Sequence, residues 1–203
     1  METRVVTVDI RRYRALLEAP ESFTSEGRLR RCMRETDPAR RMQGFAAELA
    51  LSYALSGSEL SPPRYEYDAS GRPVTDGAFI SLSHSGTYAV CAVSDVPVGV
   101  DIEMKRQVSP SVSRRVLSPK ELEEYGQTGD GGLLLRRFVI KEAFLKLTGE
   151  GISGGMSSLF PAEGRLFRKG VLAGFYSEFE HDDRFCCVVT SEERSVIYEP
   201  FSI

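Results

Sequence analysis

Gly99-Val100-Asp101-Ile102-Glu103 is the most informative stretch of this 203-residue chain. Its apolar residues alternate with Asp101 and Glu103, which predicts a strand with Val98, Val100 and Ile102 in the core and both carboxylates on the other face. Neighbouring carboxylates repel each other unless a cation lies between them or water surrounds them. The pattern is therefore typical either of a solvated acidic strand or of a site for Mg²⁺ or Ca²⁺.

A helix predicted over Leu133–Thr148 favours the metal site. Glu142 falls inside the apolar arc of this helix, and Lys146 follows one turn later. An ion pair between these two residues would explain the placement, but such a pair contributes only about 0.3–0.5 kcal/mol. Burying a carboxylate costs more than that, whereas a metal shared with Asp101 and Glu103 would compensate the charge.

The rest of the chain predicts an α+β protein, because helices and short strands occur in separate groups. One helix begins at Asp37-Pro38 and ends near Gly57, and another begins at the capping box Ser118–Glu121 and ends near Tyr125. Residues 127–132 are expected to form a loop, and residues 65–74 a hairpin that turns at 69–71. Further strands are predicted at Val5–Ile10, Phe79–Ser83, Tyr88–Val93, Val98–Glu103, Val171–Glu180, Phe185–Thr190 and Ser195–Tyr198.

The composition argues against several classes of protein. With 26 Lys+Arg, 29 Asp+Glu and a formal net charge of -3, the chain is not expected to coat nucleic acid or an anionic membrane. It has no run of about 18 apolar residues, so neither a membrane span nor a secretory signal is expected. Its four cysteines lack metal-ligand spacing, which predicts free thiols and a cytoplasmic location; they are Cys32, Cys91, Cys186 and Cys187.

Two basic or polar segments precede the acidic strand. Residues 28–41 contain six arginines, a pattern typical of a solvated helix face or of a phosphate site. Ser83-His84-Ser85-Gly86 lies between two predicted strands, where His84 is either a surface residue or an anion ligand in a tight loop.

Three motifs in this order resemble the 4′-phosphopantetheinyl transferases, and in particular their larger Sfp-type branch. They are Leu82-Ser83-His84-Ser85-Gly86, Gly99-Val100-Asp101-Ile102-Glu103, and Phe138-x-x-Lys141-Glu142-Ala143-x-x-Lys146. The strong resemblance covers about residues 65–151. It implies that the 4′-phosphopantetheine arm of coenzyme A is transferred to a serine of an apo acyl, peptidyl or aryl carrier protein, releasing adenosine 3′,5′-bisphosphate.

The resemblance also implies the roles of residues at the reaction centre. Asp101, Glu103 and Glu142 correspond to the Mg²⁺ ligands, and Glu142 or a metal-bound water would accept the proton of the attacking serine. Lys146 corresponds to a catalytic lysine that stabilises phosphoryl oxygens. Lys141 belongs to the same motif and is expected to act with it.

Binding of coenzyme A is assigned by the same resemblance to residues earlier in the chain. His84 and Ser83 would contact its phosphates, and Arg72 would lie at the nucleotide. Arg40, Arg28 and Arg31 would surround the adenosine phosphates.

The implied fold consists of two α+β halves in pseudo-twofold relation, residues 1–98 and 99–203, with the active site in the cleft between them. We expect a monomer. One residue departs from the family pattern, because Phe138 stands where a tryptophan is usual. An aromatic packing role would survive that change.

Two other functions are compatible with the same residues. A Mg²⁺-dependent phosphohydrolase acting on a nucleotide or a pyrophosphate like that of coenzyme A would also need three carboxylates and a basic clamp. A non-catalytic module that binds carrier proteins would not need the acidic set.

Overall fold

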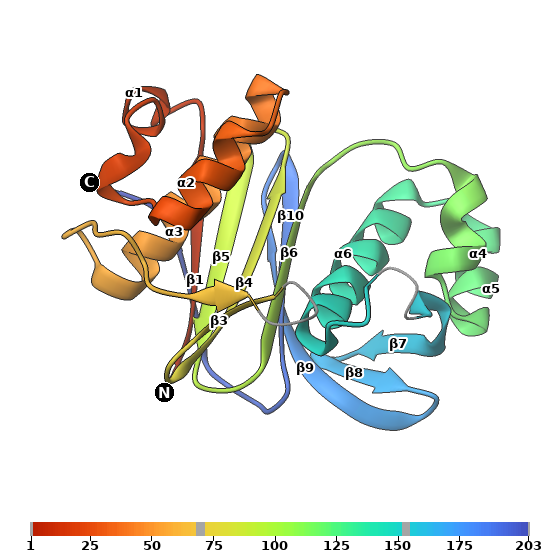
Figure 1. Cartoon of the computed structure of the whole chain (residues 1–203). Helices are drawn as coiled ribbons and strands as arrows, with labels where there is room; N and C mark the ends of the chain where they lie inside the picture. The colour runs from red at the N-terminus through yellow and green to blue at the C-terminus, as the bar shows by residue number, and fades with distance from the viewer. Residues whose placement is uncertain (1, 68–71, 152–154, 203) are drawn as a thin grey trace. The chain divides into compact units, whose positions relative to one another are not determined.

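The computed structural model describes residues 2–67, 72–151 and 155–202, which form two compact units with separate sheets (Figure 1). Unit 1 comprises Met1–Asp95 with Ser195–Ile203, and unit 2 comprises Val96–Arg194. Each unit combines helices with a largely antiparallel sheet, so the predicted α+β class is confirmed. The predicted position of the active site between two halves stays a prediction.

Unit 1 is built on a six-stranded sheet in the order β11-β1-β5-β4-β3-β2. Neighbouring strands pair antiparallel except β1 and β11, which are parallel. The strands are β1 (Thr3–Asp9), β2 (Glu66–Tyr67), β3 (Pro73–Thr75), β4 (Ala78–Ser85), β5 (Tyr88–Ser94) and β11 (Val196–Pro200).

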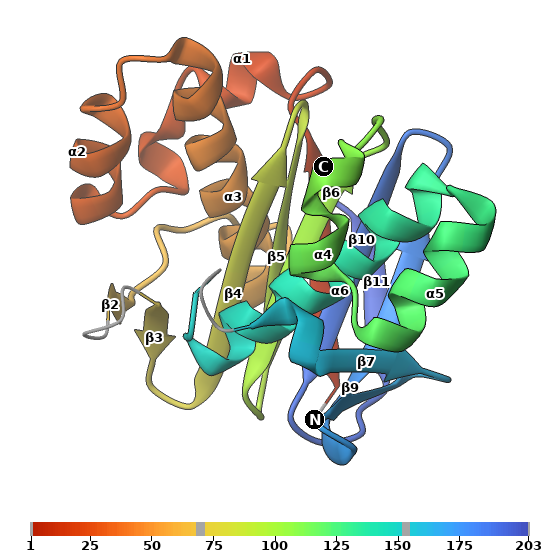
Figure 2. The ribbon, with the colours of Figure 1, turned by 90° about the vertical axis from the view of Figure 1, so that its right-hand side faces the viewer.

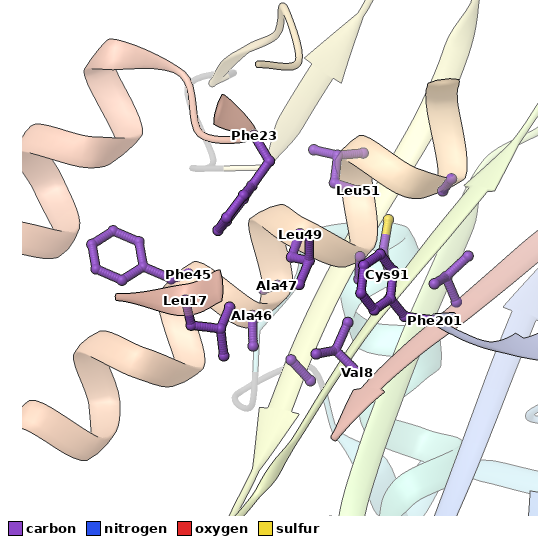
Figure 3. Close-up of a cluster of buried hydrophobic side chains, with 14 of the residues drawn as sticks. Val8, Leu17, Phe23, Phe45, Ala46, Ala47, Leu49, Leu51, Cys91 and Phe201 are labelled. Carbon is purple, nitrogen blue, oxygen red and sulfur yellow. The ribbon is translucent and has the colours of Figure 1, made fainter. Parts of the chain in front are cut away.

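Helix α3 (Pro38–Ser56) covers one face of this sheet and forms the main core of unit 1 with it. Asp37 begins the helix by accepting a hydrogen bond from the backbone N–H of Ala39 at 2.8 Å. Figure 3 shows Ala46 and Leu49 of α3 among strand residues such as Val8 and Cys91. The shorter helices are α1 (Arg14–Leu17), η1 (Pro20–Ser22) and α2 (Glu26–Met33). Leu17 of α1, Phe23 directly after η1 and Cys32 of α2 belong to the same core.

Unit 2 is built on a five-stranded antiparallel sheet in the order β6-β10-β9-β8-β7. These strands are β6 (Val98–Met104), β7 (Leu159–Ala162), β8 (Arg165–Arg168), β9 (Val171–Glu180) and β10 (Arg184–Thr190). Its helical segments are η2 (Pro110–Val112), α4 (Ser113–Val116), α5 (Pro119–Thr128), α6 (Gly131–Thr148) and η4 (Met156–Ser158).

Helix α6 packs across β6 and β10, and the short helices α4 and α5 lie on its outer side (Figure 2). Most buried apolar residues of α6, including Leu135, Val139 and Ala143, belong to one core with Cys187 and Val189 of β10. The capping box predicted at the start of α5 is present, because Ser118 and Glu121 exchange hydrogen bonds between side chain and backbone.

The predicted helix from Asp37 to Gly57 and the predicted strands that correspond to β4, β5, β9 and β10 are confirmed. The predicted loop at 127–132 is wrong, because α5 runs to Thr128 and α6 begins at Gly131. Gly129 ends the first helix in the left-handed conformation, with φ at 62°, and the Asp130 side chain caps the second. The predicted turn at 69–71 lies outside the described residues.

The predicted halves, 1–98 and 99–203, differ from the observed units at the C-terminus. Val196–Pro200 pairs with β1, so the final residues belong to unit 1. In the described part of the chain, no helix combines the length and apolar character needed to cross a bilayer. All four cysteines are buried free thiols.

Candidate functional site

The acidic strand β6 lies directly against helix α6 at Gly99. A Cβ atom at this position would stand 1.9 Å from the Ala143 carbonyl oxygen and 2.6 Å from the Leu147 nitrogen. Only a residue without a side chain permits this approach. Because Asp101 and Glu103 share the face of Gly99, the same contact turns both carboxylates toward the helix.

Asp101 is buried at this interface, with 5% of its surface exposed. Its Oδ1 accepts a hydrogen bond from Lys146 Nζ at 2.7 Å. The lysine predicted to act in catalysis therefore contacts the acidic strand. Glu103 is half-buried further along β6, where its Oε2 lies 3.8 Å from Arg106 Nε. The acidic face is therefore covered by a helix, and the alternative of a fully solvated face is wrong.

Glu142 reaches the same region from α6 and is 9% exposed. Its Oε1 is buried and accepts no hydrogen bond from the described residues. Burial raises the pKa of Glu142, the charges of Asp101 and Glu103 raise it further, and the Lys146 ammonium opposes them. Glu142 therefore interacts electrostatically with both acidic residues of β6, and we call Asp101, Glu103 and Glu142 the carboxylate cluster.

The carboxylate cluster has the donor chemistry that Mg²⁺ prefers, since all three side chains offer hard oxygens. The buried Glu142 Oε1 also lacks the compensation that a cation would supply. Across residues 2–67, 72–151 and 155–202, no three acidic, histidine or cysteine side chains are already gathered as metal ligands. The residues fit a magnesium ion, and the side chains would have to rearrange around it.

Lys141 lies apart from the carboxylate cluster. Its side chain is fully buried, and its Nζ donates hydrogen bonds to Glu121 Oε2 at 2.5 Å and to the Val116 carbonyl at 2.8 Å. Burial lowers the pKa of Lys141, while the charge and hydrogen bond of Glu121 oppose that shift. The sequence predicts Glu121 as part of a capping box, but it does not predict the ion pair of Glu121 with Lys141.

In unit 1, Ser83 and His84 lie at the end of β4, next to its hairpin with β5. Ser83 is buried and His84 is exposed, as their opposite directions on a strand require. His84 was expected in a tight loop, but β4 continues to Ser85 and pairs it with Tyr88. Arg72 is half-buried just before β3.

The three predicted arginines of the adenosine site differ in their surroundings. Arg28 Nε lies 3.4 Å from Glu48 Oε1, and its guanidinium donates to the Tyr67 hydroxyl at 3.4 Å. The Arg31 guanidinium stacks over the Tyr67 ring at 5.1 Å. Arg40 is exposed, and its Nε lies 3.9 Å from an Asp37 oxygen. The structure therefore groups Arg28 and Arg31 around one tyrosine.

Glu48 was missed by the sequence analysis. It is fully buried on α3, accepts a hydrogen bond from the Tyr65 hydroxyl at 2.6 Å, and compensates the charge of Arg28. Burial raises the pKa of Glu48, whereas Tyr65 and Arg28 oppose the shift. Tyr65 also lines an open hollow of about 870 Å³ with residues of the segments 25–27, 63–66 and 74–76. The only signal for Glu48 in the sequence was an acidic residue within an otherwise apolar stretch of the predicted helix.

Residues 97–195 match the family model of the 4′-phosphopantetheinyl transferase superfamily. This segment contains β6, α6 and the whole carboxylate cluster. This part of the chain is similar to that superfamily.

Curated relatives carry the same family name. The 4′-phosphopantetheinyl transferase psf-1 of Bacillus pumilus is 37% identical over 100 residues, which are 46% of this chain and 43% of that protein. Sfp of Bacillus subtilis (strain 168) is 26% identical over 141 residues, 65% of this chain and 63% of that protein. HetI of a Nostoc species is 29% identical over 167 residues, which are 71% of this chain and 70% of that protein. The chain thus spans less than two thirds of the length of psf-1 and of Sfp.

Proposed function

We propose that this protein transfers the 4′-phosphopantetheine arm of coenzyme A to a serine of an apo carrier protein. The observation that carries the proposal is the buried Glu142 on α6, whose charge interacts with that of Asp101 on β6, the strand that contacts α6 at Gly99. The match to the superfamily model supports the same reaction, because the matched segment holds these residues. Release of adenosine 3′,5′-bisphosphate follows from the bond that would break in coenzyme A.

Asp101, Glu103 and Glu142 would hold Mg²⁺, which would neutralise charge on the pyrophosphate of coenzyme A. Glu142 or a metal-bound water would accept the proton of the attacking serine. Lys146 is partly exposed beside Asp101, where its ammonium can donate to a phosphoryl oxygen.

Residues of unit 1 would bind the rest of coenzyme A. The exposed His84 and the adjacent Ser83 offer donors for phosphate oxygens, and Arg72, Arg31 and Arg40 offer guanidinium groups. Arg28 contributes less free charge, because the buried Glu48 already compensates it. A monomeric state and a cytoplasmic location complete the proposal.

The test is to incubate the protein with coenzyme A, Mg²⁺ and an apo carrier protein and to weigh the carrier by mass spectrometry. We expect a mass gain of one phosphopantetheine arm, lost when a chelator removes the metal and restored by excess Mg²⁺. No gain on several apo carriers, with coenzyme A still bound, would refute transfer and favour a binding module. Cleavage of coenzyme A without modification of a carrier would favour a phosphohydrolase.

A further inference from the structure

A second buried charge cluster in unit 2 surrounds Glu121, at the start of helix α5. The Glu121 side chain is fully buried, and its Oε2 accepts hydrogen bonds from Lys141 Nζ and from the backbone N–H of Ser118 at 2.8 Å. Its Oε1 lies 3.0 Å from Arg137 Nε. One carboxylate thus joins the first turn of α5 to two residues of α6.

Lys141 extends this contact to a third helix. Besides Glu121, its Nζ donates to the carbonyl of Val116, the last residue of α4. Because Lys141 has no exposed surface, it cannot reach a substrate without a rearrangement of the surrounding helices. Its position indicates a role in holding α6 in place.

Arg137 and Lys141, the two partners of Glu121, lie one helical turn apart on α6. They therefore fix the rotation of that helix about its axis. Glu142 follows Lys141 and points about 100° away from it around the axis. The close contact at Gly99 fixes the helix on the side of β6. The helix is therefore held from two directions, and Glu142 lies between those two contacts.

We propose that Lys141 and Glu121 are positioning residues, which set Glu142 against Asp101 and take no direct part in the transfer. This inference rests on the proposed function. A buried ion pair is a weak source of stability, because well-packed apolar residues often stabilise a core equally well. Placement of a reacting group, in contrast, affects rates strongly, since small displacements slow a reaction.

The experiment compares Lys141→Met, Glu121→Gln and the double variant with the wild type. The matched control is Arg136→Gln. Arg136 also lies on α6, and this change removes its solvent-exposed ion pair with Glu178 of β9. For each protein we would measure kcat and the KM for coenzyme A in carrier modification. The affinity for Mn²⁺, a probe for the carboxylate cluster, and the circular dichroism spectrum would be measured separately.

We expect each single change to lower kcat by about tenfold or more and to weaken Mn²⁺ binding by about fivefold or more, as outer groups that orient metal ligands do. The KM for coenzyme A should stay within about threefold, because unit 1 residues would bind the nucleotide. The double variant removes both buried charges, so it should fold, and it should still lose kcat and Mn²⁺ affinity, though by no more than the worse single variant. Arg136→Gln should match the wild type.

Two results would overturn the inference. A double variant that folds and keeps the wild-type kcat and Mn²⁺ affinity would show that the pair has no positioning role. Loss of kcat in Lys141→Met with wild-type behaviour of Glu121→Gln would show that Lys141 acts directly. If the wild type itself transfers nothing, the proposed function fails, and unchanged Mn²⁺ affinity in the variants would overturn the positioning role separately.

Discussion

Glu142 of a helix and Asp101 of a strand are both buried, and their two carboxylates interact electrostatically. Such a pair is unfavourable without compensation, and Lys146 supplies part of it through its hydrogen bond to Asp101. Burial raises the pKa of Glu142, and the remaining repulsion raises it further. A site that binds a divalent cation tolerates this arrangement, because the cation relieves the repulsion when it binds.

Replacing Asp101 tests this interpretation at a single residue. In Asp101→Ala, we expect carrier modification to fall by at least about a hundredfold, because a proposed metal ligand is lost. The free energy of unfolding should change by less than about 1.5 kcal/mol, since loss of the Lys146 hydrogen bond is offset by relief of repulsion. Steady-state kinetics and urea denaturation measure the two effects. Unfolding of the variant, or retention of near-wild-type rate, would contradict the metal assignment.

The buried Glu48 of unit 1 is expected to make the free energy of unfolding depend on pH. Burial raises the pKa of Glu48, so the folded protein binds its proton more tightly than the unfolded chain. The stability that this group contributes is present below its unfolded pKa of about 4.5 and is lost as the pH rises through the folded pKa. Glu48→Gln should therefore become more stable relative to the wild type as the pH rises from about 4 to 7.

Urea denaturation at several pH values measures that difference. Glu59→Gln is the matched control, because Glu59 is exposed and its replacement sets the baseline for loss of one carboxylate. The unfolding free energy of Glu48→Gln minus that of the wild type should rise with pH. If this difference stays constant or falls with rising pH, the effect of burial on Glu48 is contradicted.

At the scale of elements, the contact between β6 and α6 depends on Gly99. In Gly99→Ala, the new methyl group would overlap the Ala143 carbonyl, so we expect a loss of at least about 2 kcal/mol in unfolding free energy. Activity should fall as well, because α6 carries Glu142. Thermal and urea unfolding test the first effect, and carrier modification tests the second.

Gly126 provides the matched control for this substitution. It lies in the exposed part of α5, and a Cβ there would meet nothing within 4 Å. Gly126→Ala should stabilise the protein by about 0.5–1 kcal/mol, because alanine favours a helix. If the two alanine variants had equal stability, the close approach at Gly99 would be wrong.

The elements with clear periodicity or capping signals were predicted from the sequence, and the others were not. Asp37-Pro38 marks the start of α3, and the apolar strands β5 and β10 stand out by composition. Strands β7 and β8 were missed, because four-residue strands are too short to show alternation and Pro161 lies in one of them. The glycines between α5 and α6 predict a loop over residues 127–132, but glycines can also end helices, as Gly129 does.

At the scale of the whole molecule, sequence order gave the carboxylate cluster but not its partners. Asp101, Glu103 and Glu142 were predicted from their faces on a strand and a helix. The pairs Arg28–Glu48 and Lys141–Glu121 were not predicted, because each joins residues about twenty positions apart through tertiary packing. Such pairing changes the roles expected of Arg28 and Lys141.

One measurement tests the proposed transfer most directly. It quantifies adenosine 3′,5′-bisphosphate and modified carrier protein in the same reaction, with coenzyme A and Mg²⁺ supplied. The account predicts one nucleotide released for each carrier that gains a phosphopantetheine arm. Nucleotide release without modified carrier, or neither product while coenzyme A is bound, would contradict it.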